Sequence, residues 1–176
     1  MSTVVTKRCV QLLPSILILL ALVPIRLHAQ AKFAVYGTAG GEKTDVSNEP
    51  WTIGGTFGIY YGLTRLGPIA ISADGRGDLS RNMISALFGP RIALALPYFP
   101  IKPYFEVLGG VSTYSITDEG PRSFTDGTYR WVGGVDTSIF PHTDWRLDYS
   151  YGGGGITQNN ITRHPQSLTS GIVIRF

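Results

Sequence analysis

Residues 145–151 read Trp-Arg-Leu-Asp-Tyr-Ser-Tyr, and this stretch decides the fold class. Throughout it, large apolar or aromatic residues alternate with charged or small polar ones. A β-strand points successive side chains to opposite faces, whereas a helix would place both kinds on every side. The stretch is therefore predicted to be a strand with an apolar face formed by Trp145, Leu147, Tyr149 and Tyr151. Its opposite face carries Arg146, Asp148 and Ser150.

The same alternation recurs along the chain between segments rich in turn-forming residues. The sixth such segment is less regular, because Val132 and Phe140 fall on its polar face; a bulge or an inward-pointing ring would explain Phe140. Helical periodicity is missing after residue 31. We therefore expect an all-β chain, with boundaries accurate to about two to four residues. The expected strands lie near 32–40, 52–61, 68–77, 83–96, 101–115, 126–140, 144–154 and 167–176.

The beginning of the chain has the three parts of a secretory signal peptide. Lys7 and Arg8 precede an apolar run at 12–25, and small residues follow at Ala29 and Ala31. An uncleaved membrane helix is the weaker interpretation, because the run is shorter than the roughly 18–20 residues that cross a bilayer. We expect cleavage after Ala29, with cleavage after Ala31 as the alternative. The predicted domains are a signal peptide at 1–29 and one β domain at 30–176.

Charge and cysteine content exclude two classes of protein. The chain has 15 basic and 12 acidic residues, but three of the basic ones lie in the signal peptide, which leaves twelve of each sign. Without a basic excess, no electrostatic case exists for binding nucleic acid. The one cysteine, Cys9, precedes the apolar run, so the mature domain is expected to hold together without disulfides.

The connections alternate between short and longer, more polar ones. The expected short ones are Leu63–Gly67, Pro97–Pro100 and Pro141–Thr143, and the longer ones are Gly41–Pro50, Asp78–Asn82, Ile116–Thr125 and Ile156–Gln166. Outer-membrane barrels have short periplasmic turns and longer outer loops. The pattern predicts an eight-stranded antiparallel transmembrane up-and-down β-barrel, apolar outside and polar inside. A soluble ligand-binding barrel would need the opposite parity, which would place the charged faces around an apolar pocket.

Aromatic residues near the strand ends fit girdles at two lipid–water boundaries. They are Tyr61, Phe99, Trp145 and Phe176 on the periplasmic side, and Trp51, Phe124, Tyr129 and Tyr151 on the outer side. The alternate residues Ile172, Ile174 and Phe176 end the chain, which resembles the carboxyl-terminal signal of bacterial outer-membrane proteins. The whole pattern resembles the OmpA/OmpX-type small barrels of the outer membrane protein beta-barrel domain family. This resemblance implies an outer-membrane location, contact with outer-membrane lipid, and recognition by the barrel-assembly machinery.

Charges of both signs are predicted to face the interior. They are Lys32, Asp74, Arg76, Arg91, Glu106, Arg130, Asp136, Arg146, Asp148 and Arg175. Buried charges must be paired or hydrated. We expect Glu106 to bond one or more of Arg91, Arg130 and Arg146, and Asp136 and Asp148 to complete the network. An eight-stranded barrel is just wide enough for its side chains, so a salt-bridged plug is favoured over a catalytic or ion-conducting row.

Three classes of function remain. The favoured one is a non-enzymatic surface barrel with a structural or adhesive role and an unidentified extracellular ligand. The alternatives are a small pore for ions or solutes and a lipid-modifying enzyme. An enzyme would need a base touching a hydroxyl, and the candidates are His142 beside Asp144 and His164 near Ser167. Neither pattern is specific, so no catalytic residue, metal or cofactor is expected.

Overall fold

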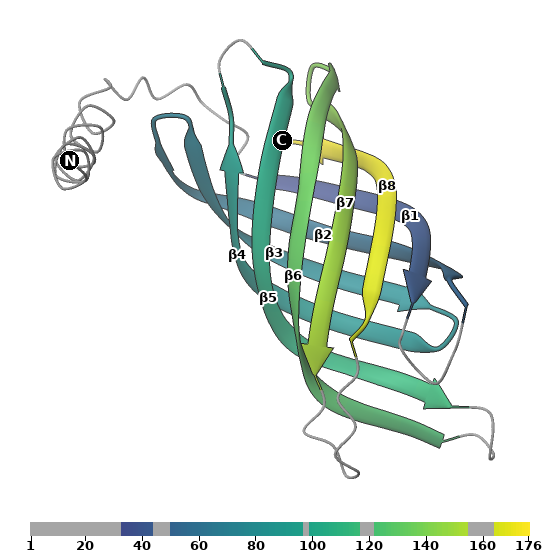
Figure 1. Ribbon diagram of the computed structural model, residues 1–176. Coiled ribbons are helices and arrows are strands. Elements are labelled where there is room, and N and C mark those ends of the chain that lie inside the picture. The colour runs from purple at the N-terminus through teal and green to yellow at the C-terminus, as the bar shows by residue number, and fades with distance from the viewer. Residues whose placement is uncertain (1–32, 44–49, 97–98, 117–121, 155–163) are drawn as a thin grey trace, which may run out of the picture.

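The computed structural model describes residues 33–43, 50–96, 99–116, 122–154 and 164–176. They form eight antiparallel strands that close into one barrel (Figure 1). Each strand pairs with the next along the chain, and the first pairs with the last. In chain order the strands are β1 (Phe33–Lys43), β2 (Thr52–Leu66), β3 (Ile69–Ser80), β4 (Met83–Leu94), β5 (Ile101–Ile116), β6 (Arg122–Phe140), β7 (Thr143–Gly154) and β8 (Gln166–Arg175).

The predicted all-β class and the count of eight strands are confirmed. None of the described segments forms a helix that is long and apolar enough to cross a membrane. The signal peptide at 1–29 and Lys32 lie outside the described residues, as do the centres of three of the expected longer loops. We call the end of the barrel with the 67–68 and 141–142 turns the turn end, and the opposite end the loop end.

Several strands extend into segments that were predicted as connections. The link expected at Leu63–Gly67 is strand up to Leu66, because a register shift between Gly62 and Thr64 absorbs the break in alternation. The chain then reverses at Gly67, whose φ of 61° is a conformation that glycine adopts without steric cost.

The connection expected at Asp78–Asn82 is the second correction. β3 continues to Ser80, because Asp78 remains paired with Ser85 in the ladder between β3 and β4. Only residues 81 and 82 separate these two strands. At the next loop-end connection β6 starts at Arg122, earlier than expected, and pairs there with Ile116.

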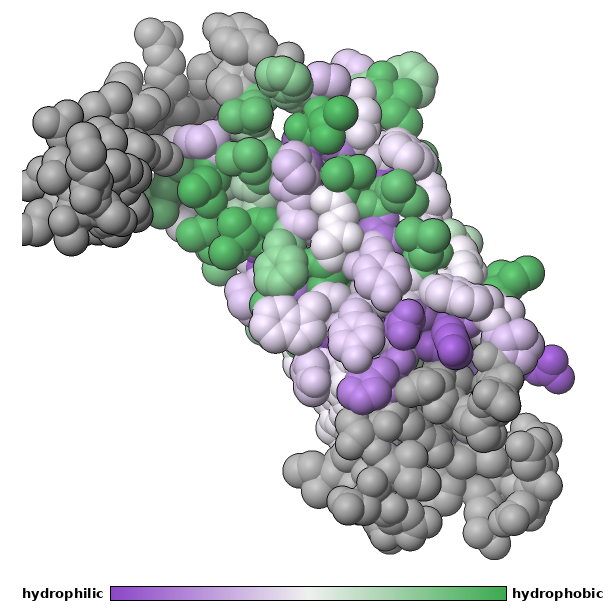
Figure 2. All heavy atoms as spheres, in the orientation of Figure 1, coloured by the Kyte–Doolittle hydropathy of each residue, from purple (hydrophilic) through white to green (hydrophobic). Residues whose placement is uncertain are grey.

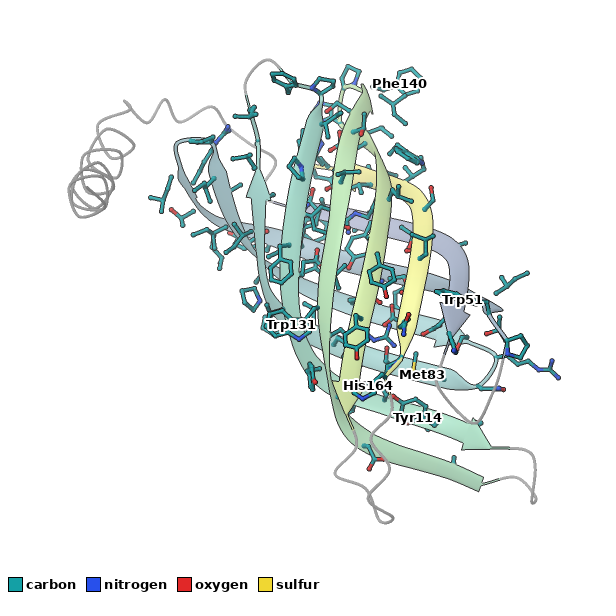
Figure 3. The ribbon with its side chains drawn as sticks, viewed as in Figure 1. Trp51, Met83, Tyr114, Trp131, Phe140 and His164 are labelled. Carbon is teal, nitrogen blue, oxygen red and sulfur yellow. The ribbon has the colours of Figure 1, made fainter. Side chains whose placement is uncertain are left out.

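Side-chain parity is that of a barrel with a polar interior. The apolar faces of the strands point outward, so large hydrophobic side chains cover the wall shown in Figure 2. The sixth strand resolves the ambiguity noted above. Val132 is fully buried inside, whereas a register shift between Ser138 and Phe140 turns Phe140 outward at the turn end, where Figure 3 labels it. The inward-ring alternative for Phe140 is therefore wrong.

Two tyrosines lie across directly paired glycines inside the barrel. Tyr36 on β1 is opposite Gly58 on β2, and Tyr104 on β5 is opposite Gly134 on β6. A Cβ added to Gly58 would lie 2.3 Å from the Tyr36 hydroxyl, and one added to Gly134 would lie 2.7 Å from the Tyr104 hydroxyl. The glycines therefore provide the space in which the phenol rings lie flat against the wall.

We predict that Gly58→Ala destabilises the barrel by about 1–3 kcal/mol, because the new methyl group must displace Tyr36 or the nearby Gly75 carbonyl. Urea unfolding of the protein folded into phosphatidylcholine vesicles would measure the loss. Gly37→Ala is the matched control, since nothing lies within 4 Å of a Cβ added there. Equal effects of the two substitutions would contradict the steric explanation.

Candidate functional site: the polar lumen

The lumen contains three layers of charged side chains stacked along the barrel. The layer at the turn end is built around Asp144. Lys102 Nζ lies 3.0 Å from Asp144 Oδ2, and Arg175 Nη2 lies 3.0 Å from Asp144 Oδ1. Ser138 donates a 2.9 Å hydrogen bond to the same carboxylate. Asp144 is buried, whereas Lys102 and Arg175 are partly exposed, so this layer closes the lumen beneath a hydrated rim.

Asp136 is the centre of the middle layer. Arg146 donates to it through Nε at 2.8 Å and through Nη2 at 3.1 Å, which is a two-point guanidinium–carboxylate contact. Arg91 donates to the same carboxylate at 2.7 Å from the other side. One carboxylate on β6 thus joins arginines on β4 and β7, and all three side chains are almost completely excluded from solvent.

Three tyrosine rings enclose these arginines. The Arg91 guanidinium lies 4.3 Å from the ring centroids of both Tyr60 and Tyr104, and the Arg146 guanidinium lies 4.0 Å from that of Tyr36. Cation–π contacts of this kind are worth more when the cation is desolvated. They stabilise the charge on faces of the guanidinium groups where no carboxylate lies.

The loop-end layer is built around Asp78. Arg76 Nε lies 2.9 Å from Asp78 Oδ1, and Arg130 Nη1 lies 3.0 Å from Asp78 Oδ2. Arg130 also reaches Glu42 at 3.3 Å, and Arg76 also reaches Asp148 at 3.2 Å. Hydroxyl groups complete the layer, because Thr56 and Ser85 donate to Asp78 and Thr169 donates to Asp148.

The six residues predicted to form the interior network all point into the lumen, but they divide between layers. Arg91, Arg146 and Asp136 lie together, and Glu106 lies 3.2 Å from Arg91 Nε. That contact is close in distance but too poorly aligned for a hydrogen bond. Arg130 pairs with Glu42 and Asp78 instead of Glu106. Asp148 pairs with Arg76 and accepts a hydrogen bond from the Tyr104 hydroxyl.

Sequence reasoning missed four charged residues of the lumen: Glu42, Asp78, Lys102 and Asp144. Each has the parity of the polar face of its strand, so the alternation itself was a usable signal. Glu42 and Asp78 were excluded because β1 and β3 were predicted to end too early. The tyrosines at 36, 60 and 104 were missed because only charged residues were considered as members of the interior network.

The two histidines considered for catalysis lie at opposite ends of the barrel. His142 occupies the Pro141–His142 turn with a φ of 70°. The His164 ring stacks on Tyr151 at 5.7 Å with an interplanar angle of 7°, near the loop end of the wall (Figure 3). Ser167 is buried and shares a 2.6 Å hydrogen bond with Ser150. Among the described residues, no group of three or more His, Cys, Asp or Glu side chains is arranged to hold a metal ion.

Comparison with known proteins identifies the fold. No family model matches the sequence, and no curated protein matches it significantly. Among solved structures, neisserial surface protein A is similar with a TM-score of 0.61 and 17% identity, over 85% of this chain and 100% of that one. The N-terminal β-barrel domain of Pseudomonas aeruginosa OprF has a TM-score of 0.51 and 12% identity, over 81% and 97%. The chain thus has the fold of the small eight-stranded outer-membrane β-barrels, as its sequence predicted.

We predict that Asp136→Ala lowers the free energy of unfolding by about 3–5 kcal/mol, because it leaves Arg91 and Arg146 buried without their shared carboxylate. Asp126→Ala is the matched control on the same strand and is expected to change stability by less than about 0.5 kcal/mol, because Asp126 is only half-buried. Urea unfolding in vesicles measures both. A mild effect at Asp136 would mean that the middle layer does not support the barrel.

Proposed function

We propose that this protein is a closed, non-enzymatic barrel of a bacterial outer membrane, which acts through its stability and its loop-end surface and does not pass solutes. The observation that carries this proposal is the filled lumen. Arg130, Arg146 and Glu106 have no exposed surface, and Asp136 and Asp148 are 1% exposed. Side chains from all eight strands therefore occupy the space that a permeating solute would need.

The outer wall supports a membrane location. Its exposed side chains include Ile53, Phe57, Phe88, Phe105, Trp131, Leu168 and Ile172. Each such side chain left in water forgoes roughly 1.5–3 kcal/mol of burial, and an exposed apolar surface of this extent marks contact with an apolar partner. Lipid supplies that partner around the whole circumference. The short turns then face the periplasm, and the loop end faces outward.

The loop end is the part of the barrel that would meet a partner outside the cell. Short turns at the other end leave little surface for recognition, whereas loops on a rigid scaffold are where binding residues usually lie. Fixed ion pairs in the loop-end layer join β1, β3, β6 and β7, so they hold the strands that carry these loops in a constant arrangement. This arrangement favours a structural or adhesive role for a barrel of this kind.

Planar-bilayer recording tests the closed lumen. Wild-type protein is expected to give no stepwise conductance above the lipid background. The Arg130→Ala/Arg146→Ala double variant removes two of the largest buried side chains and is expected to conduct if it folds. Stable ohmic channels from the wild-type protein would replace this proposal with the small-pore function.

Fractionation with heat modification tests the location. After expression with its own leader, the protein is expected in the outer-membrane fraction, and unboiled and boiled samples are expected to migrate differently on a denaturing gel. The closed ladder between β1 and β8 leaves no free edge from which detergent can begin unfolding, which is the reason for the shift. A periplasmic species without a shift would contradict the membrane assignment.

A further inference from the structure

Negative charge exceeds positive charge in the closed part of the lumen. Between the turn-end layer and the loop end, six buried carboxyl groups of the described residues face four buried arginines. The carboxyl groups are Glu42, Asp74, Asp78, Glu106, Asp136 and Asp148, and the arginines are Arg76, Arg91, Arg130 and Arg146. If every group were ionised, a water-excluded space would carry uncompensated charge, which is energetically costly.

The contacts show where the excess lies. Asp78, Asp136 and Asp148 each accept at least one hydrogen bond from an arginine. Glu42 accepts one from Arg130 near the loop end. Asp74 and Glu106 differ from these four, because neither accepts a hydrogen bond from an arginine in the part of the chain that the structure describes. One unit of the excess lies in the loop-end layer, where three carboxyl groups face Arg76 and Arg130. The other lies in the middle layer and is associated with Asp74 and Glu106.

Asp74 and Glu106 lie on either side of β4 at nearly the same height. Asp74 on β3 is paired with Gly89, and Glu106 on β5 is paired with Arg91, two residues further along β4. The glycine places no side chain between them. Within the described residues, both Glu106 oxygens and Asp74 Oδ2 lack a hydrogen-bond donor, although all three atoms are buried.

We propose that Asp74 and Glu106 form a proton-binding site that holds one proton between them in the folded barrel. Two neighbouring carboxyl groups that cannot both ionise share a proton for the same reason. With that proton, the middle layer has two negative charges, Asp136 and the Asp74–Glu106 pair, opposite the two arginines Arg91 and Arg146. The Tyr36 hydroxyl fixes Asp74 by donating a 2.8 Å hydrogen bond to its Oδ1.

Every strand contributes to the surroundings of this site. The titratable groups that face it are Tyr36 of β1, Tyr60 of β2, Arg76 of β3, Arg91 of β4, Tyr104 of β5, Asp136 of β6, and Arg146 and Asp148 of β7. At this height β8 contributes Thr169, Gly171 and Val173, none of which titrates. Arg91 Nε lies 3.2 Å from Glu106 Oε1, but Arg91 and Arg146 both also pair with Asp136, so two arginines face the three carboxyl groups Asp74, Glu106 and Asp136.

The pH dependence of unfolding tests the site. An unfolded chain releases this proton above a pH of about 4–5, whereas the folded barrel keeps it. Raising the pH above this value therefore favours unfolding for as long as the folded barrel keeps the proton. The equilibrium constant for unfolding rises by up to tenfold per pH unit for one proton. Glu106→Gln and Asp74→Asn each imitate the protonated state. Each is expected to remove this pH dependence and to raise the urea midpoint at pH 8 above that of the wild type.

Two further variants distinguish a pair of carboxyl groups that shares one proton from a site that accepts the loss of any carboxylate charge. The Glu106→Gln/Asp74→Asn double variant leaves one negative charge opposite two arginines, so it is expected to unfold far more readily than either single variant. Asp136→Asn, the same chemical change at an ionised carboxylate in the same layer, is expected to destabilise the barrel across the whole pH range. A pH slope of Glu106→Gln equal to that of the wild type would overturn the proposal.

Infrared spectroscopy of the wild-type protein keeps the test independent of variant folding. The folded barrel at neutral pH is expected to show the carbonyl band of one protonated carboxyl group, which an ionised carboxylate lacks. The band is expected to disappear when the barrel is unfolded in urea at the same pH, because the proton is then released. A folded protein without this band would show that both carboxyl groups are ionised and would refute the site.

Discussion

Closure of the backbone ladder fixes the width of the lumen, and the rest of the structure depends on that width. Once β1 pairs with β8, eight strands enclose a space that side chains just fill. Alternate residues must then point into it whatever their chemistry. The polar face of each strand is largely cut off from bulk water, so most of its charges are satisfied by residues of other strands across the lumen. The ion pairs are therefore a requirement of the closed geometry.

Several of the pairs that result connect strands that are not neighbours in the ladder. Asp136 on β6 binds Arg91 on β4, and Asp148 on β7 binds Arg76 on β3. A buried ion pair gives little net stability compared with apolar packing, but losing one partner is costly. Replacing a single member of the network is therefore expected to destabilise the barrel more than replacing both partners of a pair. In a lumen of this kind, specificity of the fold and closure to solutes have the same physical cause.

Local alternation was sufficient to predict the fold, because period-two patterning in segments such as 145–151 determines both the strand and its two faces. It also identified nine inward charges by parity, and the tenth predicted one, Lys32, lies outside the described residues. Arg91 was a predicted partner of Glu106 and lies 3.2 Å from it. Most other partners could not be predicted, since they depend on the stagger between distant strands. Arg130 illustrates this limit, because it bonds Glu42, 88 residues away, and does not bond the predicted Glu106. The bulge between Gly62 and Thr64 was likewise missed, because a break in alternation predicts the end of a strand as readily as a register shift within it.

The Tyr36–Gly58 and Tyr104–Gly134 pairs have a consequence for how this protein can change over time. In each pair, the glycine position can accept a side chain only if the tyrosine position loses its ring, because the two side chains would occupy the same volume. The glycine cannot change before its tyrosine does, although the two positions lie 22 and 30 residues apart in the chain. Descendants of this sequence should therefore vary at these sites in concert, with a smaller residue at 36 or 104 appearing before any replacement of its glycine. The hairpins β1–β2 and β5–β6 would then be inherited as units.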